Sequence, residues 1–328
     1  MSGLTSCLVR HRDDLLGEVG DAMRLVIVGG SGQLGLATAE CVAGMGIETY
    51  ILSRRAPVLE SENVKWVEAD IGNREALLAC FQKIRPDSVL NLAALLQFAC
   101  NERPRSAIDV NVHGAINVLD ACCLLDVERV IFGSSIAVYG ERTSEMFEDD
   151  PIPADANLYA LTKLLGERLG EQYHRLYGLK VLALRYSGIF GGREAATSGM
   201  SQVRSKILLT ASGQDVVIDE ASGDELIHLT DVSDAAEATC RALFEPAPHY
   251  SIYNVAGPKE NYISLRDLHS AVREHRPGCG SIKWMGKAKS AGLVNTDRLA
   301  NDLKFIPRRK LSEQIARLIP AEAMSLLH

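Results

Sequence analysis

The feature that most constrains this chain is a regular alternation of apolar runs and amphipathic helical stretches over its first 190 residues. The apolar runs are continuous, which is typical of parallel strands covered by helices on both faces. The sequence therefore predicts an α/β fold with a Rossmann-type, doubly wound parallel sheet. The predicted strands are 24–28, 49–53, 64–70, 88–94, 129–135 and 180–186, and the predicted helices are 35–45, 74–84, 107–125 and 158–176.

The alternation stops after about Ser187, where loops rich in Gly, Pro, Ser and Asp begin and lead to a last helical pattern near 311–318. We predict a dinucleotide-binding domain at 23–190 and, at 191–328, a smaller C-terminal lobe for the substrate, some segments of which return to the Rossmann core. Residues 1–22 are polar and precede the first strand. We interpret them as an N-terminal extension and assign them no function.

Charge and cysteine usage exclude several classes of partner. The formal net charge is -7 and no basic block occurs, so we expect neither nucleic acid nor a membrane surface as a partner. The eight cysteines are scattered without metal-ligand spacing, which predicts reduced core thiols and no metal. No apolar run reaches the roughly 18 residues of a membrane span, and the N-terminus lacks a signal-peptide pattern, so we expect a cytoplasmic protein with a small-molecule substrate.

A glycine cluster follows the first strand in "RLVIVGGSGQLG". Glycines at a strand-to-helix turn let the backbone approach a pyrophosphate and point free amides at it. A tight turn that uses glycine only for its geometry gives the same spacing, so this alternative stays open. The residues assigned to the cofactor here are Gly29, Gly32, Gln33, Leu34 and Gly35.

The second strand ends in Ser53, Arg54 and Arg55, where an enzyme selective for NAD usually has an acidic residue on the ribose. Two arginines suit a 2'-phosphate, so we predict NADP, with NAD as the alternative cofactor and a solvated basic turn as the other explanation. Further cofactor contacts are predicted at the ends of two more strands. Residues after the third strand would meet the adenine, and small residues beside the fourth strand would leave room for the cofactor. These residues are Asp70, Ile71, Ala93 and Ala94.

The helix that begins near Leu158 carries Tyr159 and Lys163, an i,i+4 pair on one face. A tyrosine can act as a base near neutral pH only if its pKa falls well below its usual value near 10, and Lys163 with an oxidised nicotinamide would favour the phenolate. Such a pair is also common on exposed helix faces. Ser135 ends the fifth strand in "FGSSIAVYG", where its hydroxyl would bond the substrate oxygen.

Together these residues resemble the extended short-chain dehydrogenase/reductase family, in its NAD(P)-dependent epimerase/dehydratase group. The segments "VGGSGQLG", "NLAA", "SSIAVYG", "YALTK", "LRYSGIFG" and "IHLTDVSDA" stand in the order of that family. The resemblance implies an enzyme with Ser135, Tyr159 and Lys163 as its catalytic set, Lys163 also holding the nicotinamide ribose. It implies that Asn111 supports this lysine, although a helix-interior contact is an equal alternative for Asn111. By analogy we expect a homodimer.

Two positions depart from the sugar-nucleotide members of that family, which usually have asparagine where Gly188 stands and a diphosphate-binding arginine where Asp224 stands. An acidic residue at this position would repel a diphosphate. We therefore expect poor use of nucleoside-diphosphate sugars. The predicted substrate contacts are Ser134, Ser135, Gly188, Thr197 and Ser198.

The sequence thus predicts an NAD(P)-dependent oxidoreductase or epimerase that moves a hydride at a secondary alcohol or ketone carbon of a small polar, sugar-like substrate, with Tyr159 as acid and base. Two alternatives stay open. One is a sugar-nucleotide epimerase or dehydratase with a tightly held cofactor, and the other is a non-catalytic NADP-sensing or scaffold protein.

Overall fold

The computed structural model describes residues 23–59, 61–154, 156–191, 199–289 and 291–315. The predicted N-terminal extension lies outside these residues. So do Thr197 and Ser198, two of the predicted substrate contacts.

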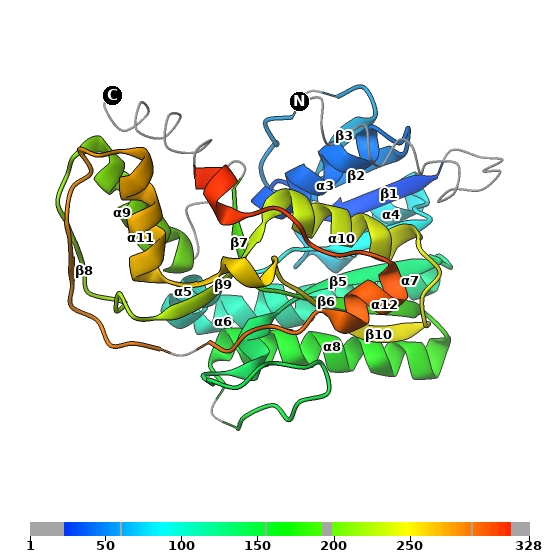
Figure 1. Ribbon diagram of the computed structural model, residues 1–328. Helices are drawn as coiled ribbons and strands as arrows, with labels where there is room; N and C mark the ends of the chain where they lie inside the picture. The colour runs from blue at the N-terminus through cyan, green and yellow to red at the C-terminus, as the bar shows by residue number, and fades with distance from the viewer. Residues whose placement is uncertain (1–22, 60, 155, 192–198, 290, 316–328) are drawn as a thin grey trace.

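Seven parallel strands form the central sheet in the order β10-β6-β5-β4-β1-β2-β3 (Figure 1). Strand β1 pairs with β2 on one side and with β4 on the other, so the order reverses between β1 and β4. Ligands of doubly wound sheets bind in the crevice at this reversal. The predicted fold class is confirmed. The strands are β1 (Arg24–Val28), β2 (Glu48–Ser53), β3 (Val64–Glu68), β4 (Ser88–Asn91), β5 (Arg129–Ser135), β6 (Lys180–Tyr186) and β10 (Tyr250–Val255).

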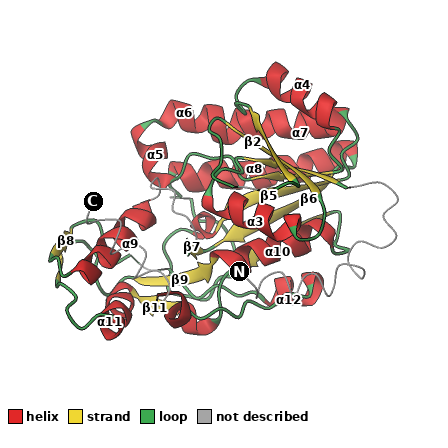
Figure 2. Cartoon of the chain, turned by 90° about the horizontal axis from the view of Figure 1, so that it is seen from above, coloured by secondary structure: helices red, strands yellow, loops and turns green. Residues whose placement is uncertain are grey.

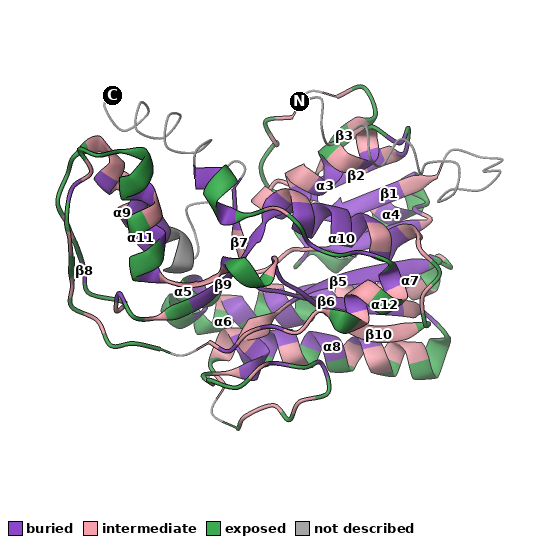
Figure 3. Cartoon of the chain, viewed as in Figure 1, coloured by how far each residue is buried: buried purple, intermediate pink, exposed green. Residues whose placement is uncertain are grey.

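Helices cover both faces of this sheet (Figure 2). Along β1, Leu25 and Ile27 pack into one apolar core, and Val26 and Val28 pack into the core on the opposite face. This two-sided burial explains why the strands are continuously apolar, and the central strands are accordingly buried in Figure 3. One face carries α3 (Gln33–Ala43), α10 (Val232–Phe244) and α12 (Asp297–Leu303); the other carries α4 (Arg74–Ile84), α7 (Gly114–Leu124) and α8 (Leu158–Tyr177).

A smaller lobe is built from the C-terminal half of the chain and surrounds its own apolar cluster, which includes Phe190, Ile207 and Leu268. Strand β10 and helices α10 and α12 come from the same half but pack on the Rossmann part (Figure 1). The lobe contains a three-stranded sheet of β7 (Gly188–Phe190), β9 (Leu226–Asp231) and β11 (Tyr262–Ser264), a parallel pair of β8 (Val216–Ile218) and β12 (Ile282–Trp284), and helices α9 (Gly199–Leu209) and α11 (Leu265–His275).

The helix predicted over 107–125 is longer and less regular than expected. It comprises α6 (Pro104–Ile108), a π-helical turn (Asp109–His113) and α7, and α5 (Gln97–Glu102) precedes it. Within the described residues, Pro104–Leu124 is long and apolar enough to cross a membrane, with a mean hydropathy of 1.2, which corrects the expectation that no stretch reaches that length. Half of this window is buried inside the fold, and its α7 part packs in the core beneath the sheet, as a core helix does.

Candidate active site

The glycine turn between β1 and α3 lies against the start of the segment that follows β4. Gly29 has a φ of +75°, and a Cβ there would lie 2.6 Å from the backbone of Ala93. Gly35 is equally constrained, because its Cβ would lie 2.5 Å from Gly30 Cα. Glycine is therefore required at both positions by close approach of the backbone.

The same turn leaves the first amides of α3 available to an anion. Gly32 is the N-cap of α3 and provides no capping hydrogen bond, and the first turn of the helix contains no acidic residue. Uncapped amides at a helix N-terminus bind phosphate groups well. The turn therefore fits the pyrophosphate of a dinucleotide.

A cavity of about 750 Å³ extends from the ends of β2 and β3 toward α6. It brings together Arg54 and Asp70, two predicted cofactor residues, with Leu95 and Arg103 on its lining. Asp70 accepts a hydrogen bond from the Gly72 amide (2.8 Å). Among the described residues the guanidinium groups of Arg54 and the adjacent Arg55 have no hydrogen bond or ion pair, so both are free to meet an anion.

Other predicted cofactor residues use their side chains elsewhere. The Ser53 hydroxyl donates to the Arg55 carbonyl (2.7 Å) and accepts from Trp66 Nε1 (3.2 Å), so it holds the end of β2. The Gln33 amide donates to the Gly191 carbonyl and joins the start of α3 to the end of β7. Leu34 and Ile71 pack into the two apolar cores. The side chains of these residues thus have partners within the described chain.

Ser135 and Tyr159 meet at the carboxyl end of β5. Helix α8 begins at the N-cap Asn157, whose side chain accepts from the Ala160 amide (3.0 Å), and this places Tyr159 in the first turn. Burial raises the pKa of Tyr159 to about 12, while a hydrogen bond from Ser135 acts to lower that pKa. Near neutral pH the phenol is therefore protonated when nothing is bound to the protein. A cation in the crevice is needed to favour the phenolate.

Lys163 lies one helical turn further along α8 and is almost completely buried. Its ammonium donates to the Gly133 carbonyl (2.6 Å) and lies 5.8 Å from the centre of the Tyr159 ring. Lys163 forms no ion pair with any carboxylate of the described chain, and burial lowers its pKa to about 8. Lys163 thus places a buried positive charge beside the Tyr159 phenol.

Asn111 stands in the π-helical turn, a distortion often found at functional sites. Its side chain accepts from the Leu95 amide (2.7 Å) and donates to the Leu95 carbonyl (3.0 Å) and the Thr162 hydroxyl (3.0 Å). The implied support of Lys163 is therefore indirect, because Asn111 holds the neighbour of Lys163 and the segment after β4.

Ser134, a predicted substrate contact, points toward α8 instead of the crevice surface. Its side chain is buried and its hydroxyl donates to Glu167 on α8 (2.5 Å). Gly188 opens β7, and a Cβ there would lie 3.1 Å from the Leu229 side chain, so the position is close-packed and offers no extra space.

Asp224, the acidic residue expected to repel a diphosphate, forms an ion pair with Arg266. Arg266 donates to its carboxylate from Nε (3.1 Å) and Nη2 (3.0 Å), and both side chains are exposed. A carboxylate beside a guanidinium repels a diphosphate much less than an isolated one.

Two buried charged residues escaped the sequence analysis. Glu167 lies one turn after Lys163 on α8, and Arg185 interrupts the apolar strand β6. A charged residue in a strand buried on both faces is the signal that could have identified this pair.

Comparisons with known proteins agree with this geometry. The family model described as "NAD dependent epimerase/dehydratase family" matches residues 25–256. The chain is 28% identical to Protein CapI of Staphylococcus aureus, over 90% of this chain and 97% of that protein. It is 28% identical to UDP-glucuronate 4-epimerase of Thermodesulfobacterium geofontis, over 64% of this chain and 63% of that protein.

Its fold is similar to that of UDP-glucuronic acid 4-epimerase from Bacillus cereus, solved in complex with UDP-glucuronic acid and NAD. The TM-score is 0.80 with 20% identity, covering 93% of this chain and 100% of that one.

Proposed function

Since the chain belongs to the NAD dependent epimerase/dehydratase family, we propose that it inverts a secondary alcohol carbon of a sugar by oxidising that carbon and reducing it again from the other face. The observation that supports this reaction best is the convergence of Ser135, Tyr159 and Lys163 at the carboxyl end of β5. Membership of an enzyme family sets aside the non-catalytic scaffold alternative. We propose further that the Rossmann part is 23–190 and that 191–328 mainly holds the substrate, with β10, α10 and α12 returning to the Rossmann core.

Each residue of this set has a separate task in the proposal. A bound nicotinamide dinucleotide would supply the acceptor and later the donor of the hydride. Tyr159, as phenolate, takes the proton of the substrate hydroxyl when the hydride leaves the carbon, and it returns that proton when the hydride comes back. Ser135 donates to the same oxygen, and the positive charge of Lys163 stabilises the phenolate.

The cofactor belongs to the nicotinamide dinucleotides, and within this class we propose a preference for NADP. The free guanidinium groups of Arg54 and Arg55 support this choice, as does the place of Arg54 on the lining of the same cavity as Arg103. A 2'-phosphate there would gain charge-assisted hydrogen bonds.

For the substrate we propose a sugar carried on a nucleoside diphosphate, like the substrates named for the UDP-glucuronate 4-epimerases to which the chain is similar. The pairing of Asp224 with Arg266 supports this choice, because a paired carboxylate repels a diphosphate less than an isolated one. The other candidate is net oxidation of a small polar alcohol, which the absence of an amide side chain at Gly188 favours.

We propose a homodimer in the cytoplasm. Helices α5, α6 and α8 pack against one another, and each exposes large apolar side chains: Phe98 (43% exposed), Ile108 (37%), Leu161 (46%) and Leu165 (44%). Such side chains would be covered by the same helices of a second copy. The free thiols of the described residues are in keeping with a reducing compartment.

The test is incubation of the protein with UDP-glucuronate or UDP-glucose and either NAD or NADP, followed by proton NMR of the sugar and absorbance of the reduced cofactor. The proposal expects the epimeric sugar without net accumulation of reduced cofactor. Accumulation of reduced cofactor with small polyols, and no epimer, would establish the dehydrogenase instead.

A further inference from the structure

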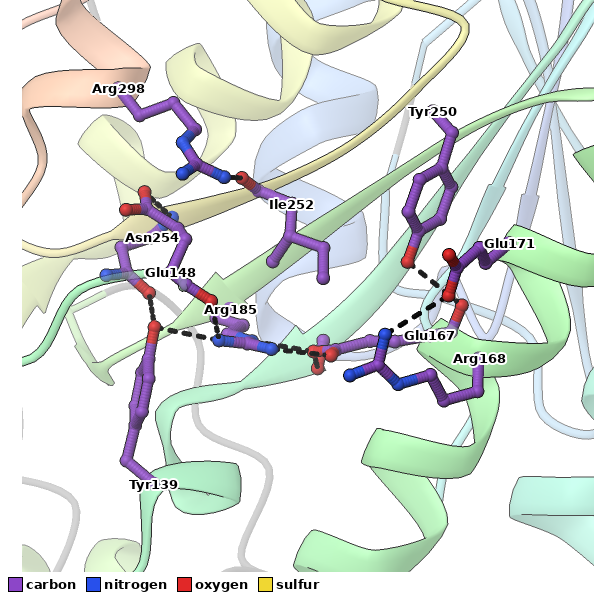
Figure 4. Close-up of polar contacts among 11 residues, drawn as sticks. Tyr139, Glu148, Glu167, Arg168, Glu171, Arg185, Tyr250, Ile252, Asn254 and Arg298 are labelled. Atoms are coloured by element: carbon purple, nitrogen blue, oxygen red, sulfur yellow. Dashed lines mark hydrogen bonds and ion pairs between the residues drawn. The ribbon is translucent and has the colours of Figure 1, made fainter. Parts of the chain in front are cut away.

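A buried ion pair lies directly behind the catalytic residues. Arg185 and Glu167 are only 2% and 1% exposed, and they form two parallel hydrogen bonds: Nε to Oε1 (2.8 Å) and Nη2 to Oε2 (2.7 Å) (Figure 4). This bidentate geometry fixes the two side chains relative to each other. The pair therefore joins β6 rigidly to the middle of α8.

The remaining guanidinium nitrogen extends the network toward the segment after β5. Arg185 Nη1 donates to the Tyr139 hydroxyl (2.9 Å) and the Glu148 carbonyl (3.1 Å), and the Tyr139 hydroxyl donates to Asn254 Oδ1 (2.7 Å). Figure 4 shows Arg185 between Tyr139 and Glu167. Tyr139 ends the short 3-10 helix (Ile136–Tyr139) that begins immediately after Ser135.

Such a network is not needed for stability alone. Replacement of a buried ion pair by well-packed apolar residues is often neutral or stabilising, because the charges must leave water. What an ion pair with fixed geometry adds is a unique arrangement of the elements it joins. The question is therefore which arrangement this pair selects.

The answer lies in the contacts between α8 and the end of β5. Lys163 donates to the carbonyl of Gly133, and one turn later Glu167 accepts from the hydroxyl of Ser134. Two successive turns of the helix thus hold two successive residues of the strand. The next strand residue is Ser135, and the preceding helical turn carries Tyr159.

We propose that the Glu167–Arg185 pair is a positioning device, which acts through Ser134 and Tyr139 to fix the register of α8 on β5 and so the approach of Tyr159 to Ser135. This inference rests on the proposed function for these two residues. A misplacement of about 1 Å in an active site can lower the rate by about 100-fold. Neither Glu167 nor Arg185 contacts a reacting atom in this account.

The deciding variant is Ser134→Ala, because it removes the link to β5 and leaves the ion pair intact. Glu167 Oε1 still accepts from Arg185 in this variant, so no carboxylate oxygen loses its last partner. The matched control is Tyr186→Phe. Tyr186 lies on the same strand as Arg185, and this variant removes its buried hydrogen bond with the Thr239 hydroxyl (2.7 Å). Thr239 belongs to α10, on the other face of the sheet.

Steady-state kinetics separate position from stability. We expect Ser134→Ala to lower kcat by about tenfold, with KM values for sugar and cofactor within about twofold of wild type and with a displaced pH profile of kcat. Tyr186→Phe should lower Tm and leave kcat and the pH profile unchanged. A kcat of Ser134→Ala within twofold of wild type would overturn the positioning role.

Hydrogen exchange provides a readout that does not depend on any substrate. We expect faster amide exchange in Ser134→Ala at the end of β5 and in the first turns of α8, and no such change in Tyr186→Phe. If wild type turns over no nucleotide sugar, the proposed function fails, and exchange alone then tests the register. Unchanged exchange at both segments in Ser134→Ala would refute the inference whatever the activity.

Discussion

Two neighbouring turns of helix α8 differ in whether their buried charges form an ion pair. The catalytic turn (Tyr159 and Lys163) holds an ammonium that forms no ion pair with a carboxylate of the described chain, and burial lowers the pKa of Lys163 to about 8, although the charge of Glu167 acts to raise it. The ion-pair turn (Glu167 with Arg185) neutralises its charges completely. There burial acts to lower the pKa of Arg185, but the hydrogen bonds and charge of Glu167 raise it above its usual value.

The contrast shows where the fold contains a group that lowers the stability of the folded state. An unpaired buried cation destabilises the folded state, and it is found where the proposed reaction needs a positive charge beside a phenol. One turn away, where the proposed reaction needs fixed geometry, the charges are paired and hydrogen-bonded.

The largest effect is expected from Glu167→Ala. Removal of the carboxylate leaves the Arg185 guanidinium buried and uncompensated, which should lower the free energy of unfolding by about 3–5 kcal/mol. Chemical denaturation measures this loss. The control is Glu171→Ala on the next turn of α8, whose exposed partners Arg168 and Arg175 make its ion pairs worth about 1 kcal/mol or less. Equal losses in the two variants would show that the pair at Glu167 has no special weight.

The next effect concerns the catalytic turn. Tyr159→Phe should lower kcat by about 100-fold, since a positioned acid–base group typically contributes that much. Its affinity for the cofactor should stay close to that of wild type in calorimetry. Turnover at the wild-type rate would remove Tyr159 from the mechanism.

A smaller effect, on cofactor affinity, is expected from the exposed and unpaired guanidinium groups of Arg54 and Arg55. In the double variant Arg54→Ala, Arg55→Ala we expect about a tenfold loss of affinity for NADP, or about 1.4 kcal/mol, and little change for NAD. Titration of both cofactors against wild type and variant measures this difference. Equal affinities of the wild type for NAD and NADP would identify the two arginines as solvated bystanders.

The sequence predicted the Rossmann fold because burial on both faces leaves a continuous apolar pattern, and the bounds of β5 and β6 agree with those expected. Local patterns also located the glycine turn, where close approach to Ala93 requires Gly29. These features depend on neighbours in sequence or on the periodicity of a single element.

The sequence did not reveal side-chain partners that are distant along the chain. Ser134 and Ser135 are adjacent serines, and only the position of Glu167 on the packed α8 shows that Ser134 points into the core. The ion pair of Asp224 joins it to Arg266, which lies 42 residues away. Asn111 lies in a π-helical turn that no residue pattern announced, and its partners Leu95 and Thr162 are 16 and 51 residues away.

The central claim, that the catalytic turn keeps a charge which the fold would be more stable without, is tested most directly by Lys163→Met. In wild type the folded-state pKa of Lys163 is about 8. That value lies below the value of about 10.4 for an unfolded lysine, so the unfolded chain binds the extra proton between these two pH values. The stability of wild type therefore rises as the pH increases through this window.

Unfolding of both proteins should be measured from pH 7 to pH 10.5. We predict that at pH 7 Lys163→Met is more stable than wild type by up to about 3 kcal/mol, that this advantage disappears near pH 10, and that the variant turns over no substrate. A variant that is less stable than wild type at pH 7 would contradict the account, because it would mean that the buried ammonium stabilises the fold.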